Sequence, residues 1–239
     1  MRSRGDSNNK TCVLLFSKYP EEGKVKSRLE KHICGKIVVE IYRNFVLDIL
    51  SMLNRSNIPF IVFFNPIDAL KKFESWLGTK YEYLPQIGNN LGERLKNGFV
   101  DVFSKDFRNV IILGSDIPDL SEDILFEACA ALENSDVVIG PSSDGGYYLI
   151  AFKRTTFFPK IFEKIVWSTN TVYSETIERL KKGKRKVHIL PLWSDIDTLE
   201  DLKAFVNKYY KIKNNSSKTI RYLLQHEEIL NERTHLSEA

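Results

Sequence analysis

Basic side chains are concentrated in one short segment of this sequence, residues 17–29, which also contains Gly23. The cations of the segment are Lys18, Lys24, Lys26 and Arg28. Glycine lets a ligand approach the backbone closely, while lysine and arginine bind phosphate oxygens as a mobile and a forked cation. The segment therefore suits phosphate binding, although it has neither the P-loop nor the G-x-G-x-x-G spacing. Its composition is equally typical of a solvated basic loop.

Carboxylates stand at three further places where they could hold a divalent cation. Asp116 lies in the segment 114–119, which is bounded by glycine and contains a proline. Asp195 and Asp197 are separated by one residue, and Asp144 precedes two glycines. Mg²⁺ typically binds one or two carboxylates and completes its shell with phosphate and water, so these residues suit a metal–phosphate site.

Each acidic segment also has a purely structural explanation. Asp116 or Asp119 could accept backbone N–H bonds in a capping turn, and Asp197 or Thr198 could cap a helix. The pair Asp144–Gly145, between two apolar runs, is a strong hairpin signal. Two acidic segments together with the basic one favour a phosphate–metal site more than any of them does alone.

The elements that must position these residues alternate between short apolar runs and segments with helical periodicity. The expected buried strands are Thr11–Phe16, Phe60–Phe64, Val110–Leu113 and Val137–Ile139. Residues 35–54 carry an apolar stripe and are expected to form a helix, as are residues 121–132. Such alternation predicts an α/β fold with three α-β-α layers around a mostly parallel sheet. Ligands bind beyond the carboxyl ends of such strands, where the basic and acidic segments lie.

The second half of the sequence is less regular. Residues 147–152 are expected to form a strand antiparallel to the one before it. A further strand is expected at Val187–Leu192 and a helix at Thr198–Tyr209. After a polar stretch, an amphipathic helix is expected to begin at about Lys218.

These patterns predict a division of the chain into three parts. Residues 1–10 are polar and are expected to form a loose leader. Residues 11–210 are expected to form one domain that contains the strands and the candidate site. Residues 211–239 are expected to form an appended helix and tail.

The composition excludes several classes of protein. Hydrophobic residues make up 43% and charged residues 28% of the 239 residues, which is typical of a globular chain. Lys and Arg number 35 against 31 Asp and Glu, and a net charge of +4 does not indicate a nucleic-acid partner. The three cysteines are far apart, which argues against disulfides and zinc. Because no apolar stretch could span a bilayer and no signal peptide is visible, we expect a cytoplasmic protein.

Six segments of the sequence together resemble one known family. Residues 16–29 are similar to its opening pattern F-x-K-x-P-x-x-G-x-V-K-[TS]-R-L, with Ser27 where Thr is usual. The others follow in the family's order at 88–95, 114–118, 140–148, 167–169 and 195–198. These are features of the DUF2064 group, which is assigned to the glycosyltransferases of the nucleotide-diphospho-sugar transferase superfamily. The resemblance covers roughly residues 11–209 and implies the Rossmann-like GT-A fold.

The resemblance also implies roles for individual residues. Lys26 and Arg28 would contact phosphates, and Gly92 and Arg94 would border the nucleotide. Lys18 and Lys24, from the basic segment itself, complete the expected phosphate-binding residues. The ligands of Mg²⁺ or Mn²⁺ would be Asp116, Asp195 and Asp197. The acceptor side would be lined by Asp144, Gly145, Gly146, Trp167 and Ser168. Among these, the candidates for a direct part in catalysis are Asp116, Asp144 and Lys26.

Three functions remain open at this stage. The first is a metal-dependent glycosyltransferase, with a nucleotide-sugar donor and a small-molecule acceptor as its partners. The second is a nucleotidyltransferase, similar to the molybdenum-cofactor and phospholactate guanylyltransferases, which would release pyrophosphate from an NTP. The basic loop suits a triphosphate well, but the opening pattern L-x-G-G-x-S-x-R-M-G-x-x-K of that class is missing, which favours the first. The third is a nucleotide-binding protein without catalysis, against which the intact aspartates argue.

Overall fold

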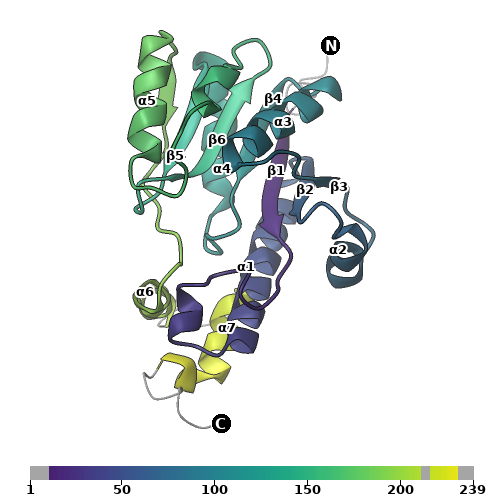
Figure 1. Cartoon of the computed structure of the whole chain (residues 1–239), viewed down its shortest axis with the longest axis vertical. Coiled ribbons are helices and arrows are strands. Elements are labelled where there is room, and N and C mark those ends of the chain that lie inside the picture. The colour runs from purple at the N-terminus through teal and green to yellow at the C-terminus, as the bar shows by residue number, and fades with distance from the viewer. Residues whose placement is uncertain (1–10, 211–215, 231–239) are drawn as a thin grey trace, which may run out of the picture.

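The computed structural model describes residues 11–210 and 216–230. The expected leader, residues 1–10, lies outside the described residues, as do residues 211–215 and 231–239 of the expected tail. The described residues form a seven-stranded sheet in the order β3-β2-β1-β4-β6-β5-β7 (Figure 1). The strands are β1 (Thr11–Lys18), β2 (Phe60–Asn65), β3 (Tyr83–Pro85), β4 (Asn109–Leu113), β5 (Val137–Pro141), β6 (Tyr147–Lys153) and β7 (Val187–Ile189).

All strands of this sheet except β6 run in the same direction. β1 is parallel to β2 and to β4, β2 is parallel to β3, and β5 is parallel to β7. β6 is antiparallel to both of its neighbours, β4 and β5, because the short turn after β5 reverses the chain. The sheet is therefore mostly parallel with one antiparallel strand, as the sequence predicts, and the α/β class is confirmed.

Helices cover both faces of the sheet. They are α1 (Gly35–Ser56), α2 (Leu70–Leu77), α3 (Leu91–Ser104), α4 (Glu122–Asn134), α5 (Val172–Lys182), α6 (Leu199–Tyr209) and α7 (Lys218–Gln225). One apolar cluster joins α1, α2, α4, α6 and α7 to the sheet, and a second joins α3, α5 and the 3₁₀ turn Pro159–Phe162 to it. Val13 and Leu15 of β1 belong to the first cluster, while Leu14 belongs to the second. This three-layer arrangement explains why β1 is apolar without interruption from Cys12 to Phe16.

The expected strand Val187–Leu192 is shorter in the structure. β7 ends at Ile189, although the backbone N–H of Leu190 still donates to the Ile139 carbonyl at 2.9 Å. Pro191 has no N–H group to continue the pairing, and Leu192 is 65% exposed. Trp193 then returns to the end of β5, where its N–H donates to the Pro141 carbonyl. This path leads the following acidic segment back towards the sheet.

The expected C-terminal helix is present as α7, and it packs onto α1. Asp48 of α1 is buried and accepts hydrogen bonds from the Ser217 hydroxyl at 2.6 Å and from the backbone N–H groups of Lys218 and Thr219 at 2.7 and 3.0 Å. Its carboxylate thereby caps the first turn of α7. α7 lies beside α1 in Figure 1, and its residue Ile220 is buried in the same apolar cluster as α1.

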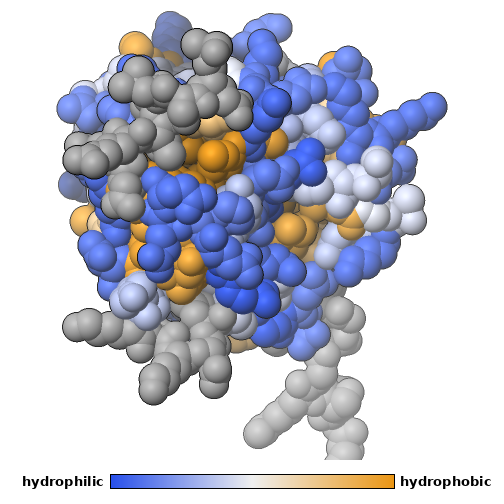
Figure 2. Space-filling model, turned by 90° about the horizontal axis from the view of Figure 1, so that it is seen from below, coloured by the Kyte–Doolittle hydropathy of each residue, from blue (hydrophilic) through white to orange (hydrophobic). Residues whose placement is uncertain are grey.

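The surface around α6 and α7 is mostly hydrophilic, with smaller apolar areas between the polar side chains (Figure 2). Within residues 11–210 and 216–230, none of the helices has both the length and the hydrophobicity that a membrane crossing needs.

Candidate active site

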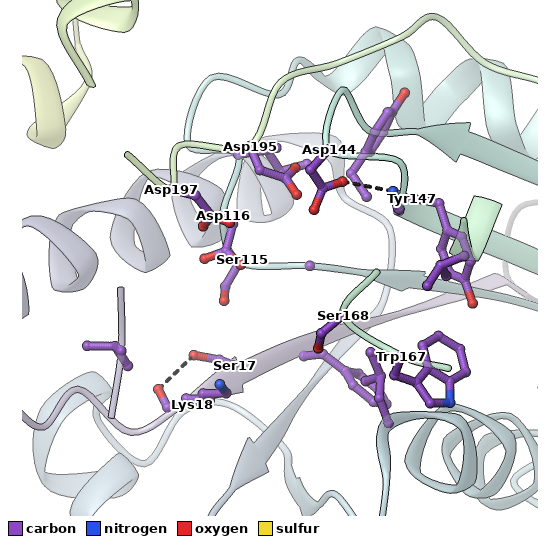
Figure 3. Close-up of a pocket in the computed structure, with 18 of the residues that line it drawn as sticks. Ser17, Lys18, Ser115, Asp116, Asp144, Tyr147, Trp167, Ser168, Asp195 and Asp197 are labelled. Atoms are coloured by element: carbon purple, nitrogen blue, oxygen red, sulfur yellow. Dashed lines mark hydrogen bonds between the residues drawn. The ribbon is translucent and has the colours of Figure 1, made fainter. Parts of the chain in front are cut away.

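A pocket of about 520 Å³ opens where β1 and β4 end. Segments that are far apart in the sequence line it, among them the loop after β1, the turn after β4, the turn between β5 and β6, segment 167–172 and the segment before α6 (Figure 3). They meet because the carboxyl ends of parallel strands lie at the same edge of the sheet. The pocket therefore lies at the carboxyl ends of the strands, where the sequence predicts ligand binding.

Lys26 lies between two of the expected metal ligands. Its ammonium nitrogen is 2.5 Å from Asp116 Oδ1 and 2.8 Å from Asp197 Oδ1, and only 4% of its side chain is exposed. Burial lowers the pKa of Lys26, but the carboxylates of Asp116 and Asp197 more than offset this and raise the pKa above its ordinary value. Conversely, burial raises the pKa of Asp197, yet Lys26 and Arg28 hold it below its ordinary value. Lys26 and Asp197 are therefore both charged at neutral pH.

Asp197 is available to Lys26 because its neighbour caps the next helix. The Thr198 hydroxyl accepts a hydrogen bond from the Asp201 N–H at 3.2 Å, and the Asp201 carboxylate accepts one from the Thr198 N–H at 2.8 Å. This reciprocal capping box begins α6 without Asp197. Of the two capping residues that the sequence leaves open, the cap is Thr198. Arg28 reaches the other oxygen of Asp197 from a distance of 3.5 Å.

Asp195 and Asp144 form a second pair of carboxylates beside the first. Burial, together with the negative charges of Asp116 and Asp144, raises the pKa of Asp195 to about 7. Asp144 Oδ1 accepts a hydrogen bond from the Gly146 N–H at 2.8 Å, so the turn between β5 and β6 holds this side chain (Figure 3). The site thus contains one carboxyl, that of Asp195, whose pKa lies close to neutral pH.

Tyr42 joins the ends of β1 and β4, and sequence reasoning did not single it out. Its hydroxyl lies 2.8 Å from the Ser115 hydroxyl, 3.3 Å from that of Ser17, and accepts from the Lys18 N–H at 3.0 Å. Burial, with the charge of Asp116, raises the pKa of Tyr42. Because Tyr42 falls in the expected helix 35–54 and looks like one more core residue, no motif marks this role.

The opposite side of the pocket is apolar and aromatic. The rings of Tyr147 and Trp167 meet edge to face with centroids 6.5 Å apart, and in Figure 3 they lie away from the four labelled aspartates. Ser168 lines the pocket between them and Ser17, with a left-handed backbone (φ 65°) that is unusual for a residue other than glycine. Backbone strain of this kind is common at ligand sites.

Most of the expected site residues line this pocket. They are Lys18, Lys26, Arg28, Asp116, Asp144, Gly146, Trp167, Ser168, Asp195 and Asp197. The remaining four expected residues, Lys24, Gly92, Arg94 and Gly145, do not line it.

Three of these four instead shape the structure around the pocket. A Cβ atom on Gly92 would lie 2.5 Å from the Phe162 carbonyl oxygen and 2.8 Å from Trp167 Nε1. A Cβ atom on Gly145, which has φ +87°, would lie 2.2 Å from the Asn170 carbonyl oxygen. Arg94 Nε donates to the Gly88 carbonyl at 3.0 Å and so supports the loop before α3.

The expected metal ligands meet in the pocket without forming a closed cage. Within the described part of the chain, no group of three or more His, Cys, Asp and Glu side chains is arranged to hold a metal ion. The side chains of Asp116 and Asp197 are 43% and 32% exposed and share Lys26. This donor set fits a cation that takes one or two carboxylates and draws its other ligands from phosphate and water.

Comparison with known proteins places the chain in a family. Residues 48–169 match the model of the family described as "Uncharacterized protein conserved in bacteria (DUF2064)". The chain is also 35% identical to a Desulfovibrio desulfuricans G20 protein that is provisionally assigned as a nucleotide-diphospho-sugar transferase. The match covers 93% of this chain and 97% of that one, with a TM-score of 0.89. None of the curated proteins is significantly similar to this chain.

More distant structures share the fold. A cytidylyltransferase from Leptospira borgpetersenii is 15% identical, with a TM-score of 0.53 over 94% of this chain and 98% of that one. The Mycobacterium tuberculosis protein Rv0371c, in complex with manganese, is 12% identical, with a TM-score of 0.50 over 82% of this chain and 97% of that one. Together with the closer match, they confirm the expected nucleotide-diphospho-sugar transferase fold.

Proposed function

The chain belongs to the DUF2064 family, and from that premise we propose that it is a glycosyltransferase that uses a nucleotide-diphospho-sugar donor. One observation supports this most directly. The cations that follow β1 and the carboxylates that follow β4 and β7 face one another in a single pocket, and Lys26 is shared between Asp116 and Asp197. Opposite charges at such close range suit a ligand that combines phosphate with a divalent cation.

The donor's diphosphate would bind at the cationic side of the pocket. Arg28 is 62% exposed on its side chain and Lys18 is exposed, so both can turn towards a ligand. Lys26 can exchange one of its carboxylate contacts for a phosphate oxygen without losing its charge. These cations stabilise the negative charge that develops on the leaving group.

The reaction joins an acceptor oxygen to the sugar. A bond forms between the acceptor's hydroxyl oxygen and the anomeric carbon, while the bond from that carbon to the β-phosphate oxygen breaks. The electron pair leaves on the nucleoside diphosphate, and the hydroxyl proton passes to a carboxylate. Asp144 is our candidate for that base, because it lines the pocket and is held by the Gly146 N–H.

A divalent cation fits the donor set of this site. Asp116, Asp195 and Asp197 would hold Mg²⁺ or Mn²⁺, and the bound cation would supply positive charge for the leaving diphosphate. The fold relative Rv0371c, which is in complex with manganese, supports the choice of ion. The Lys26 ammonium already lies between Asp116 and Asp197, where the cation would bind. We therefore expect cation binding to depend on phosphate, which can draw Lys26 away from one carboxylate.

A thermal-shift panel of nucleoside diphosphates, nucleotide-sugars and NTPs, with and without Mn²⁺, tests the proposal. Ligands that bind the native state raise the unfolding midpoint. We expect a nucleotide-sugar to give the largest rise, and only with the cation present. Subsequent transfer of a labelled sugar, without release of pyrophosphate from any NTP, would support the reaction class.

Nucleotidyl transfer is the second candidate. Besides Lys26, two further cations, Lys18 and Arg28, line the pocket, which is enough positive charge for a triphosphate. Release of pyrophosphate from one NTP in the presence of a phosphorylated acceptor would favour this reaction over glycosyl transfer.

A further inference from the structure

The part of the pocket that faces away from the aspartates forms an apolar chamber. We use this name for the space lined by Leu91, Leu95, Ile112, Tyr147, Ile150 and Trp167. Ile112 of β4 and Ile150 of β6 are paired in the sheet and form its floor. Leu91 and Leu95 belong to α3, and the Tyr147 and Trp167 rings close the side opposite the carboxylates.

Close packing against two glycines positions the wall of the chamber. Gly92 touches Trp167 and the Phe162 carbonyl so closely that no Cβ would fit, and Gly145 touches Asn170 in the same way. The Tyr173 N–H also donates to the Gly145 carbonyl at 2.8 Å. The segment 167–172 is thereby held against α3 at one end and against the turn between β5 and β6 at the other.

The chemistry of the chamber differs from that of the rest of the pocket. The described lining residues that come from α3, from β6 and from segment 167–172 include no charged side chain. Leu91 lines the pocket and is 43% exposed. Covering this apolar surface with a ligand would favour binding. The polar groups at the rim are hydroxyls, such as that of Ser168.

We propose that the apolar chamber binds the body of the acceptor, and that this acceptor is a hydroxyl compound carrying an uncharged ring or a compact hydrocarbon group. The proposal rests on the proposed function, because it takes the charged side for the donor. The acceptor's hydroxyl would then point towards Asp144, with its apolar body between Trp167 and the sheet.

A nucleobase is the rival occupant, and the lining argues against it. A base needs partners for several polar atoms on its edge. Among the side chains that line the chamber, the polar groups are the buried Tyr147 hydroxyl and the Trp167 indole N–H, which lies against Gly92. Gln86 offers such a partner on the cationic side, near the end of β1. Its amide nitrogen donates to the carbonyls of Ser17 and Phe63, which leaves the amide oxygen for a ligand.

Binding of 1-naphthol and of glycerol to the full-length protein tests the proposal by isothermal calorimetry. Each is titrated alone and in the presence of whichever of UDP, GDP, CDP and ADP binds best with Mn²⁺. We expect 1-naphthol to bind at least tenfold more tightly than glycerol, and to bind equally well when the nucleotide is present.

Variants connect this binding to the chamber. Trp167→Ser should weaken 1-naphthol at least tenfold, and Trp167→Phe, which keeps an apolar ring, should restore most of the affinity. Leu91→Asn should weaken it severalfold because the chamber then exposes a polar amide. Val100→Asn is the matched control, since Val100 is 51% exposed on the same helix but does not line the pocket.

The outcomes separate this proposal from the proposed function. Displacement of 1-naphthol by the nucleotide would mean that the chamber holds the base, and equal binding of glycerol would mean that it selects no apolar body. Either result overturns the acceptor assignment while donor binding stands. If 1-naphthol binds but no nucleotide does, the proposed function fails, and the acceptor assignment fails with it.

Discussion

The two sides of the pocket are held in place by different means. The charged wall, which consists of Lys26, Asp116, Asp144, Asp195 and Asp197, lies mostly at strand ends. The register of β1 against β4 pairs Leu15 with Leu113, so Ser17 and Ser115 follow at matching levels, and Tyr42 joins them. The apolar chamber depends instead on a non-strand segment anchored at glycines. A change in one wall should therefore leave the other largely intact.

Among the substitutions considered, Asp116→Ala in the charged wall is expected to lower activity the most. It removes a proposed metal ligand and leaves Lys26 with one carboxylate, so we expect the transfer rate to fall by about 10²–10³-fold. Metal-dependent nucleotide binding should weaken sharply, while 1-naphthol still binds. Calorimetry and sugar-transfer assays measure both effects. Asp123→Ala, an exposed aspartate in the first turn of α4, is the control. Unchanged metal-dependent binding in Asp116→Ala would refute the site assignment.

Gly145→Ala breaks the anchor of the apolar chamber. Its methyl group would overlap the Asn170 carbonyl, and such overlap costs about 1–3 kcal/mol beyond the backbone strain. Gly78→Ala is a matched control, because Gly78 has φ +89° against +87° for Gly145 but no atom near its Cβ position. Urea unfolding should show Gly145→Ala to be the less stable variant. Equal stabilities would mean that the segment moves aside at no cost.

Asp195→Asn tests how the stability of the protein depends on pH through the charged wall. The pKa of Asp195 is about 7 when folded, against about 4 in an unfolded chain. The folded state therefore binds more protons between these values, and this group makes the wild type less stable as pH rises from about 4 to about 7.

Replacing Asp195 with asparagine removes that loss. In a chelator-containing buffer, the variant should gain about 1–3 kcal/mol on the wild type between pH 4 and pH 8, less than the full shift implies because the group is partly solvated. Denaturation at several pH values measures the gain. A difference between Asp195→Asn and the wild type that stays constant over this pH range would contradict the prediction.

Much of the fold follows from local patterns. The four clearest strands and the helix beginning at Gly35 are predicted because buried parallel strands are uninterruptedly apolar and surface helices have an apolar stripe. The edge of the sheet that carries the site follows from the same reasoning. The three-residue strand β3 and the eight-residue helix α2 are too short to show a clear period and are not predicted, and neither is α3.

The pairing inside the site could not be predicted in the same way. The residue types after each strand indicate phosphate and metal chemistry, but Lys26 and Asp197 are 171 positions apart, and their contact depends on how the two loops meet. Likewise, Gly92 and Gly145 read as ligand-approach glycines in the sequence, whereas in the structure they are places where backbone and side chains pack against each other. Only tertiary geometry separates these two uses of glycine.

The contact between Asp48 and the start of α7 has a consequence for how the chain folds. It joins residues about 170 positions apart, between the first helix and the last helix described. Contacts of such long sequence separation form late, because the chain must close a large loop before they contribute. We therefore expect one side of α1 to stay exposed to solvent during synthesis until α7 has been made. The β1–α1–β2 unit can assemble early, but its outer surface is completed by the last helix described.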